Sequence, residues 1–283
     1  MKQIPYLGVG IGLRRVHFND VLLSTQGIDW FELLSENYMK FGGRPKIILE
    51  HLISKKVPLI PHGVELSLGS LDELDKNYLL KLEELLKLTK PAWFSDHLCF
   101  SSFGKVHYHD LIPVLLTNES LEHISDRIKL IQDRFQIPFA IENISYYVNS
   151  CHHKMEEFEF IHKLVDKTDV ALLLDVNNVY VNSINHDFDA IEYINHLPLK
   201  NVIQIHLAGH WNRGDIIIDT HGNHIINEVW ELYRYSLKKI KRPISTLIEW
   251  DNNIPDYKEL IQITSKARDI LNNQFSSEVN SWI

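Results

Sequence analysis

The sequence predicts an α/β fold, a single (β/α)8 TIM barrel, and three observations carry this prediction. Eight short apolar runs recur along the chain, and each ends abruptly in polar or ionisable residues. The runs are rich in Val, Ile, Leu and Phe without strict alternation, which is typical of parallel strands buried on both faces. No glycine-rich phosphate turn follows a run, and Gly8 and Gly10 lie inside the first one, which disfavours an open doubly wound sheet.

The predicted strands follow one another at spacings that leave room for a helix between most neighbours. They are GVGIGLR from Gly8, DWFELLSEN from Asp29, VPLIPHG from Val57, PAWFSDHL from Pro91, IPFAIEN from Ile137, VALLLDVNN from Val170, NVIQIHLAGH from Asn201 and STLIEWD from Ser245. The longest purely apolar stretch, at 170–174, is far too short to span a membrane.

The segments between these runs have helical periodicity. Residues 71–90 carry Leu79, Leu82, Leu85 and Leu86 on one face and end in lysines, an amphipathic stripe with cations at the C-terminus. Residues 117–135 start at Thr-Asn-Glu-Ser and place isoleucines and a leucine at helical spacing. Residues 155–165 and 227–240 have similar patterns. Strands that alternate with helices in this way indicate the barrel.

Composition narrows the protein class. The chain has 283 residues, 45% apolar and 23% charged, and no Pro/Gly-rich linker divides it, so we predict one catalytic domain over residues 1–283. Its formal charge is -8, from 29 Lys+Arg and 37 Asp+Glu, which disfavours a nucleic-acid partner. With only Cys99 and Cys151 and no apolar N-terminal stretch, the sequence favours a cytoplasmic protein without a membrane segment.

Side chains that commonly bind metals stand at the ends of six predicted strands or in the loops that follow. These are His62; Asp96 with His97; Glu142 with Asn143; Asp175 with Asn178; His206 and His210, followed by Asp219 and His221; and Glu249 with Asp251. Taken alone, His62 fits a hydrogen-bonded turn, Asp96 a helix cap and Glu142 a satisfied buried pair. Taken together, they would converge on one barrel mouth, where buried carboxylates need cations. The pattern therefore predicts a metal site.

The number of ligands predicts more than one ion. A catalytic metal usually takes about three protein ligands, so four histidines and four carboxylates suggest two or three ions, with Glu142 or Asp175 as a bridge. Imidazole and carboxylate without thiolate suit iron, manganese or zinc, and ligand type alone does not choose among them. Most of the other histidines are interpreted as surface, loop or capping residues; His107 and His109 are expected in a loop after the fourth strand.

Several motifs resemble one known family in content and order. They are GVGIGLR, LLSENY, HGVELSLGS, SDHL, IENISYY, LLLDVNNVYVNSINHDFD, QIHLAGH, DTH, VW and LIEWD. In this order they resemble the DUF692 family, the MbnB-like multinuclear non-haem iron-dependent oxidative enzymes (MNIO). The resemblance runs from Gly8 to about Pro255 and implies a barrel similar to xylose isomerase and endonuclease IV.

The resemblance also implies a chemistry. Its iron ligands fall on His62, His97, Glu142, Asp175, Asn178, His206, Asp219, His221 and Glu249. Its proton-handling acid falls on Asp251, and His210 matches a further family position near the metals. It implies two or three irons, mixed Fe(II)/Fe(III), with O2 as co-substrate. The implied reaction is oxidation of cysteine, or of another residue, in a ribosomally synthesised precursor peptide during natural-product (RiPP) biosynthesis, aided by a separate leader-binding partner protein.

Three other interpretations compete with this one. An endonuclease IV-like metal-dependent phosphodiesterase fits the ligands but not the charge of -8. A divalent-metal sugar isomerase is weakened because no lysine lies next to the ligand positions. A metal-storage protein is disfavoured because an enclosed barrel mouth would bind few ions per chain.

Overall fold

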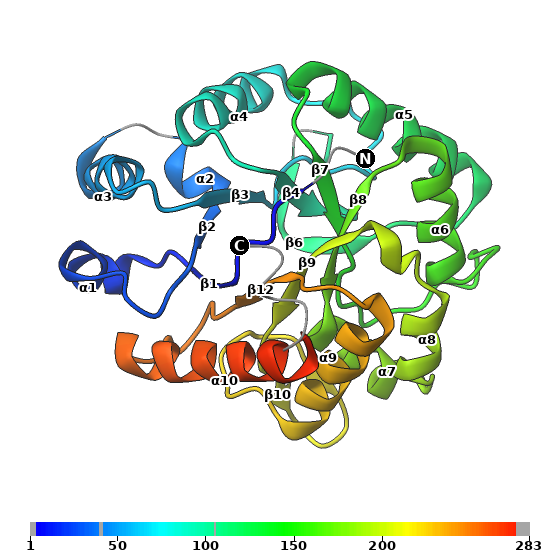
Figure 1. Cartoon of the computed structure of the whole chain (residues 1–283). Helices are drawn as coiled ribbons and strands as arrows, with labels where there is room; N and C mark the ends of the chain where they lie inside the picture. The colour runs from blue at the N-terminus through cyan, green and yellow to red at the C-terminus, as the bar shows by residue number, and fades with distance from the viewer. Residues whose placement is uncertain (1–3, 40–41, 105, 276–283) are drawn as a thin grey trace.

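Eight parallel strands form a closed barrel in the computed structural model, which describes residues 4–39, 42–104 and 106–275. Around the barrel the strands follow chain order, and the last pairs with the first (Figure 1). They are β1 (Val9–Gly12), β2 (Phe31–Leu34), β3 (Leu59–Gly63), β4 (Phe94–His97), β7 (Phe139–Glu142), β8 (Ala171–Asp175), β9 (Val202–Leu207) and β12 (Ser245–Ile248). Each predicted apolar run contains one of them, so the barrel prediction is confirmed.

Helices surround the barrel on the outside (Figure 1). The α-helices are α1 (Phe18–Leu23), α2 (Ser35–Tyr38), α3 (Gly43–Ser54), α4 (Lys76–Thr89), α5 (Asn118–Phe135), α6 (Glu157–Thr168), α7 (Val176–His186), α8 (Ala190–His196), α9 (Asn227–Ile240) and α10 (Tyr257–Phe275), with short 3-10 turns η1 (Arg15–His17) and η2 (Leu199–Asn201). None of the helices in the described ranges is long and apolar enough to cross a membrane.

Side-chain caps set where two predicted helices begin. The helix expected over 71–90 starts later, at Lys76, because the Asp75 carboxylate accepts hydrogen bonds from the backbone N–H groups of Asn77 and Tyr78. The Thr117 hydroxyl caps α5 in the same way, through the backbone N–H of Ser120. Local sequence therefore sets where these two helices begin.

Two small antiparallel hairpins extend the loops after β4 and β9. One pairs β5 (Cys99–Phe103) with β6 (Val106–Pro113), and the other pairs β10 (Trp211–Asn212) with β11 (Ile217–Ile218). His107 and His109, expected in a loop, lie on the exposed half of β6 instead. Because both hairpins follow the C-terminal ends of barrel strands, they build up the rim of the mouth.

The barrel interior changes from apolar to polar along the strands. A cluster of buried apolar side chains fills the part nearer to the N-terminal ends of the strands: Trp30, Ile60, Trp93, Ala140, Ala171, Leu173, Ile203 and Leu247. Since side chains two residues apart on a strand face the same way, Ile60 is followed inside the barrel by His62, Ala140 by Glu142 and Leu247 by Glu249. The same two-residue step leads from Leu173 to Asp175. The apolar layer is thus the floor on which a layer of ligand-type side chains rests.

Candidate metal centre

The structure brings seven of the predicted ligands, together with Asp251, into three adjoining groups. In each group one ligand atom per residue lies within 4.8 Å of the others: His62, His97 and Glu142; Glu142, Asp175, His206 and Glu249; and His221, Glu249 and Asp251. Glu142 belongs to the first two groups and Glu249 to the last two. The three groups are therefore linked by shared carboxylates, as in a site for several ions.

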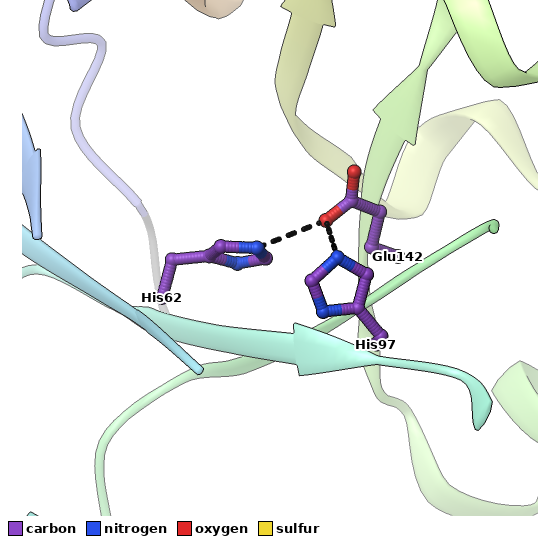
Figure 2. A group of neighbouring side chains, drawn as sticks. All are labelled: His62, His97 and Glu142. Atoms are coloured by element: carbon purple, nitrogen blue, oxygen red, sulfur yellow. Dashed lines mark ion pairs between the residues drawn. The ribbon is translucent and has the colours of Figure 1, made fainter. Parts of the chain in front are cut away.

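The first group is formed by two imidazoles that point at one carboxylate oxygen. The Nε2 atoms of His62 and His97 lie 3.2 and 3.3 Å from Oε2 of Glu142 (Figure 2). Each ring is held from behind: His62 Nδ1 lies 2.8 Å from the Ser95 hydroxyl, and His97 Nδ1 lies 3.0 Å from the Gly63 carbonyl. Because a carbonyl only accepts, His97 donates from Nδ1, which leaves the Nε2 lone pair directed at the site.

The second group is the most deeply buried. Nδ1 of His206 lies 2.9 Å from Oε2 of Glu249 and 3.3 Å from Oε1 of Glu142. Asp175 completes the group, and its Oδ1 accepts a 2.6 Å hydrogen bond from the backbone N–H of Asn178 at the start of α7. That bond turns the second oxygen of Asp175 toward the site.

The third group lies nearest to the mouth. His221 Nδ1 is 3.2 Å from Glu249 Oε2 and 3.3 Å from Asp251 Oδ2, while its Nε2 is 2.8 Å from Asp219 Oδ1. His221 has a left-handed backbone (φ 44). Asp219 is fixed by hydrogen bonds from Ser145 (3.0 Å) and Asn177 (2.9 Å). His221 thus has two carboxylates at Nδ1 and a third at Nε2, so either ring nitrogen can serve as a ligand.

Of the residues that the family resemblance implies, three lie outside these groups. Asp219 and Asn178 line the same cavity as the groups, and Asn178 binds the Asn143 carbonyl through its amide nitrogen at 3.0 Å, which leaves its buried Oδ1 free. His210 is buried beside the centre: its Nδ1 lies 2.8 Å from Asn177 Oδ1, and its ring stacks on Tyr180. His210 therefore reaches the site through Asn177.

The unpartnered polar atoms of this region fit a metal. Buried side-chain oxygens and nitrogens nearly always have hydrogen-bond partners. Among the described residues, the buried atoms that lack one include Glu142 Oε2, Asp175 Oδ2, Asn178 Oδ1, His206 Nδ1, His221 Nε2 and Glu249 Oε2. Among them, His206 Nδ1 lies 2.9 Å from Glu249 Oε2 and His221 Nε2 lies 3.8 Å from Asp175 Oδ2, in both cases without hydrogen-bond geometry. All six belong to predicted ligands, so a set of imidazole, carboxylate and amide donors converges on positions where cations would satisfy them.

The electrostatics of the cluster point the same way. Burial raises the pKa of Asp175 well above its ordinary value, although His221 opposes the change. Burial lowers the pKa of His62 well below its ordinary value, and the neighbouring His97 and His206 add to the effect. A buried carboxylate that resists ionisation and a buried imidazole that stays neutral are both what a cation would stabilise, the first as an anion and the second as a lone-pair donor.

Sequence reasoning missed one buried acid at this centre. Glu32, on β2, is 3% exposed, and its Oε2 lies 3.0 Å from Nε2 of His206. The sequence did contain a signal for it, because Glu32 stands two residues after the interior Trp30, as His62 does after Ile60. The run continues as Leu33 and Leu34, so Glu32 does not mark a strand end.

A cavity of about 850 Å³ opens above the three groups. His62, His97 and Glu249 lie among its deep walls, and Leu111, Ile112 and Pro113 of β6 form part of its rim. On the same rim, the loop after β7 contributes Tyr146, Tyr147 and the 75% exposed Val148. Arg14 is the one Lys or Arg among the described lining residues, and it forms an ion pair with Asp251. The cavity thus combines a polar, ligand-rich base with an apolar lip.

Comparison with families and sequences gives one consistent result. The model of a family described as RiPP precursor modification enzyme MbnB/TglH/ChrH matches residues 8–272. A UPF0276 protein of Anaeromyxobacter sp. (strain Fw109-5) is 43% identical over 264 residues, 93% of this chain and 93% of its own. A UPF0276 protein of Acaryochloris marina (strain MBIC 11017) is 40% identical over 260 residues, 92% and 93% of the two chains.

Comparison with solved structures gives the fold. The D-allulose 3-epimerase of Methylomonas sp. has a TM-score of 0.63 at 10% identity and covers 97% of this chain and 100% of its own. Endonuclease IV of Thermus thermophilus has a TM-score of 0.57 at 13% identity, with 94% and 99% covered. These are xylose isomerase-like TIM barrels, and at such identities the likeness concerns architecture alone.

Proposed function

The chain belongs to the MbnB/TglH/ChrH family of RiPP precursor modification enzymes, and we propose that it uses iron and dioxygen to oxidise a cysteine, or another residue, in a ribosomally synthesised precursor peptide. The observation that carries the proposal is that three ligand groups at the base of the cavity are joined by the shared carboxylates of Glu142 and Glu249. We assign residues 1–283 to one catalytic domain. A separate protein that binds the peptide leader is part of the proposal and rests on the family alone.

The proposed metal ligands are those on which the three groups and their immediate neighbours are built. They are His62, His97, Glu142, Asp175, Asn178, His206, Asp219, His221 and Glu249. The set has no thiolate, and mixed imidazole and carboxylate ligation suits iron as well as manganese or zinc. The choice of two or three irons, some Fe(II) and some Fe(III), rests on the family. Bound iron would supply binding positions for dioxygen and for a substrate thiolate, and the capacity to accept electrons from the substrate.

The chain's own residues supply the acid–base chemistry. Asp251 lies at the mouth, 42% exposed, with one oxygen 3.3 Å from His221 Nδ1 and the other in the ion pair with Arg14. Arg14 thereby fixes the carboxylate where an entering substrate would meet it, and we assign to Asp251 the removal of a substrate proton. His210 acts as a positioning residue, because it holds Asn177, and Asn177 in turn holds Asp219.

The cavity supports a peptide as the substrate. Its volume of about 850 Å³ lies near the upper end of ordinary small-molecule sites, which span roughly 300–1,000 Å³. The lip formed by Leu111, Tyr147 and Val148 offers apolar surface to the residues that flank a reacting side chain. A cysteine side chain can enter the polar base while its neighbours remain at the lip.

The test begins with anaerobic purification and metal analysis, followed by aerobic reaction with a short cysteine-containing precursor encoded near the gene. The expected result is iron in the protein and a change of peptide mass that requires both iron and dioxygen. A His221→Gln variant is the control and should leave the peptide mass unchanged. Full iron loading with no change in any such peptide would refute the proposal. Stoichiometric zinc with cleavage of abasic DNA would instead favour an endonuclease IV-like phosphodiesterase, and interconversion of sugars would favour an isomerase.

A further inference from the structure

Below the second ligand group, a line of hydrogen bonds joins four buried side chains from β2, β9 and the entry to β4. Trp93 Nε1 donates to Gln204 Oε1 at 2.6 Å, and Gln204 Nε2 donates to Glu32 Oε2 at 2.6 Å. The same Glu32 oxygen lies 3.0 Å from His206 Nε2. Exposure is 0% for Trp93, Gln204 and His206 and 3% for Glu32, so solvent does not compete for these bonds.

The donors in this line are fixed by chemistry. An indole N–H only donates, so the oxygen of Gln204 must face Trp93, and its NH2 group must face the other way. That NH2 group lies 2.7 Å from His206 Nε2 as well as 2.6 Å from Glu32. Around His206 Nε2 there is consequently one donor, Gln204, and one acceptor, Glu32.

This arrangement decides which nitrogen of His206 can bind an ion. Nδ1 faces Glu142 and Glu249 and belongs to the second ligand group, whereas Nε2 faces away from it. For Nδ1 to offer its lone pair in the neutral ring, the proton must lie on Nε2. Gln204 cannot accept that proton, and Glu32 can. Glu32 itself belongs to none of the three groups.

We propose that Glu32 is a positioning residue of the metal centre: its carboxylate accepts the Nε2 proton of His206 and so directs Nδ1 at the ion held with Glu142, Asp175 and Glu249. A carboxylate behind a ligating imidazole fixes the ring tautomer and increases the basicity of the ligand nitrogen. The inference rests on the metal centre of the proposed function and is independent of the identity of the peptide.

Two substitutions of Glu32 should weaken metal binding to different degrees. Glu32→Gln keeps the shape and one acceptor oxygen but removes the charge, and Glu32→Leu removes the acceptor. The apparent affinity for one ion per chain should fall about 10-fold in the first and about 100-fold in the second, the range known for partners of metal-binding histidines. The measurement is metal content after anaerobic dialysis against graded chelator, with Fe(II) and, in parallel, Co(II), whose visible absorption reports the change of ligand field.

Two controls separate positioning from general stability. Glu36→Gln alters a nearby acid that binds Tyr78 (2.6 Å) and the Val64 N–H (3.0 Å) and touches no ligand. Trp93→Phe breaks the same buried line at its far end, where Trp93 contacts Gln204, and leaves both Glu32 and Gln204 beside His206. Both controls should lower the thermal unfolding midpoint and keep every ion at wild-type affinity.

The outcomes are decisive in both directions. Selective loss of one ion in the Glu32 variants alone supports the inference. Unchanged metal affinity in Glu32→Leu, or equal metal loss in Trp93→Phe, would show that Glu32 is only a structural part of the buried line. Neither readout uses a peptide, so a failure to find oxidised product would leave this result intact, and the proposed function could fail on its own.

Discussion

Glu142 offers the sharpest test of how the ligand groups are joined, because it belongs to two of them and His97 belongs to one. Glu142→Gln keeps the side-chain volume and removes the charge that both groups share. His97→Gln changes one group and leaves the other intact. Nε2 of His97 lies 3.3 Å from Oε2 of Glu142, and both side chains are buried, so the two substitutions alter neighbouring positions in the same environment.

The expected magnitudes follow from counting ligands. Without Glu142, the first group keeps two residues, His62 and His97, and the second keeps three, Asp175, His206 and Glu249. Since a stable catalytic ion takes about three protein ligands, the first ion should be lost and the second weakened, by about tenfold or more. Without His97, the first group also falls to two ligands, but the second keeps all four.

The assay is metal content per chain, measured after anaerobic dialysis over a series of free-metal concentrations. Glu142→Gln should lose one ion outright and release a second at higher free metal than wild type. His97→Gln should lose the first ion only. If His97→Gln weakened the second ion as strongly, or if Glu142→Gln kept wild-type content, the shared-carboxylate arrangement would be wrong. Circular dichroism of both variants verifies that the barrel is retained.

The remaining predictions concern metal removal, the acid at the mouth and a partly buried carboxylate outside the centre. Removal of metal by a chelator should lower the thermal unfolding midpoint, because an ion that binds only the folded state adds about 2.7 kcal/mol to the free energy of unfolding at a hundredfold excess over its Kd. An unchanged midpoint would contradict the metal site. Asp251→Asn should keep the ions of the two deeper groups and lower turnover about 10²–10⁴-fold, measured by peptide mass spectrometry, whereas normal turnover would remove Asp251 from the mechanism. Desolvation raises the pKa of Glu157 from 4.5 to about 7, so the folded state resists ionisation of this carboxyl and stability is lost as pH rises from 4.5 to 7. The free energy of unfolding of Glu157→Gln, relative to wild type, should therefore increase by up to about 3 kcal/mol between pH 4.5 and pH 8. Equal differences in urea midpoint at the two pH values would refute this.

The barrel could be predicted because its strands are short, apolar and cut off by polar residues. That signal works where the ligand is the last inward-facing residue of the strand, as at His62 and Glu142, or directly follows the strand, as at Glu249. It fails at Glu32, where the strand continues through Leu33 and Leu34. Glu32 can be found only when the inward positions of β2 are counted from Trp30, which requires knowledge of which face of the strand is interior.

The hairpins and the other histidines show a different limit. β5 and β6 pair mainly with each other and stand partly in solvent, so their sequences lack the apolar periodicity that indicates a strand. His17, a histidine outside the predicted ligand set, is 3% exposed, and its Nε2 lies 2.8 Å from the Pro255 carbonyl. That partner is 238 positions away in the sequence, a distance that no local pattern encodes.

The choice among peptide, sugar and DNA substrates depends on the mouth, because barrels with this architecture serve different chemistries. The structural neighbours include sugar epimerases and an endonuclease at TM-scores of 0.52–0.63. A DNA backbone needs several free cations, yet among the described residues of the cavity wall the one Lys or Arg is Arg14, and Asp251 pairs with it. A sugar, covered with hydroxyls, would gain little from exposed Val148 and the apolar side chains of β6. The proposal of a peptide rests on the opposite arrangement: the mouth is apolar at the lip and acidic with imidazole at the base, so a reacting side chain could reach the base while its neighbours remain at the lip.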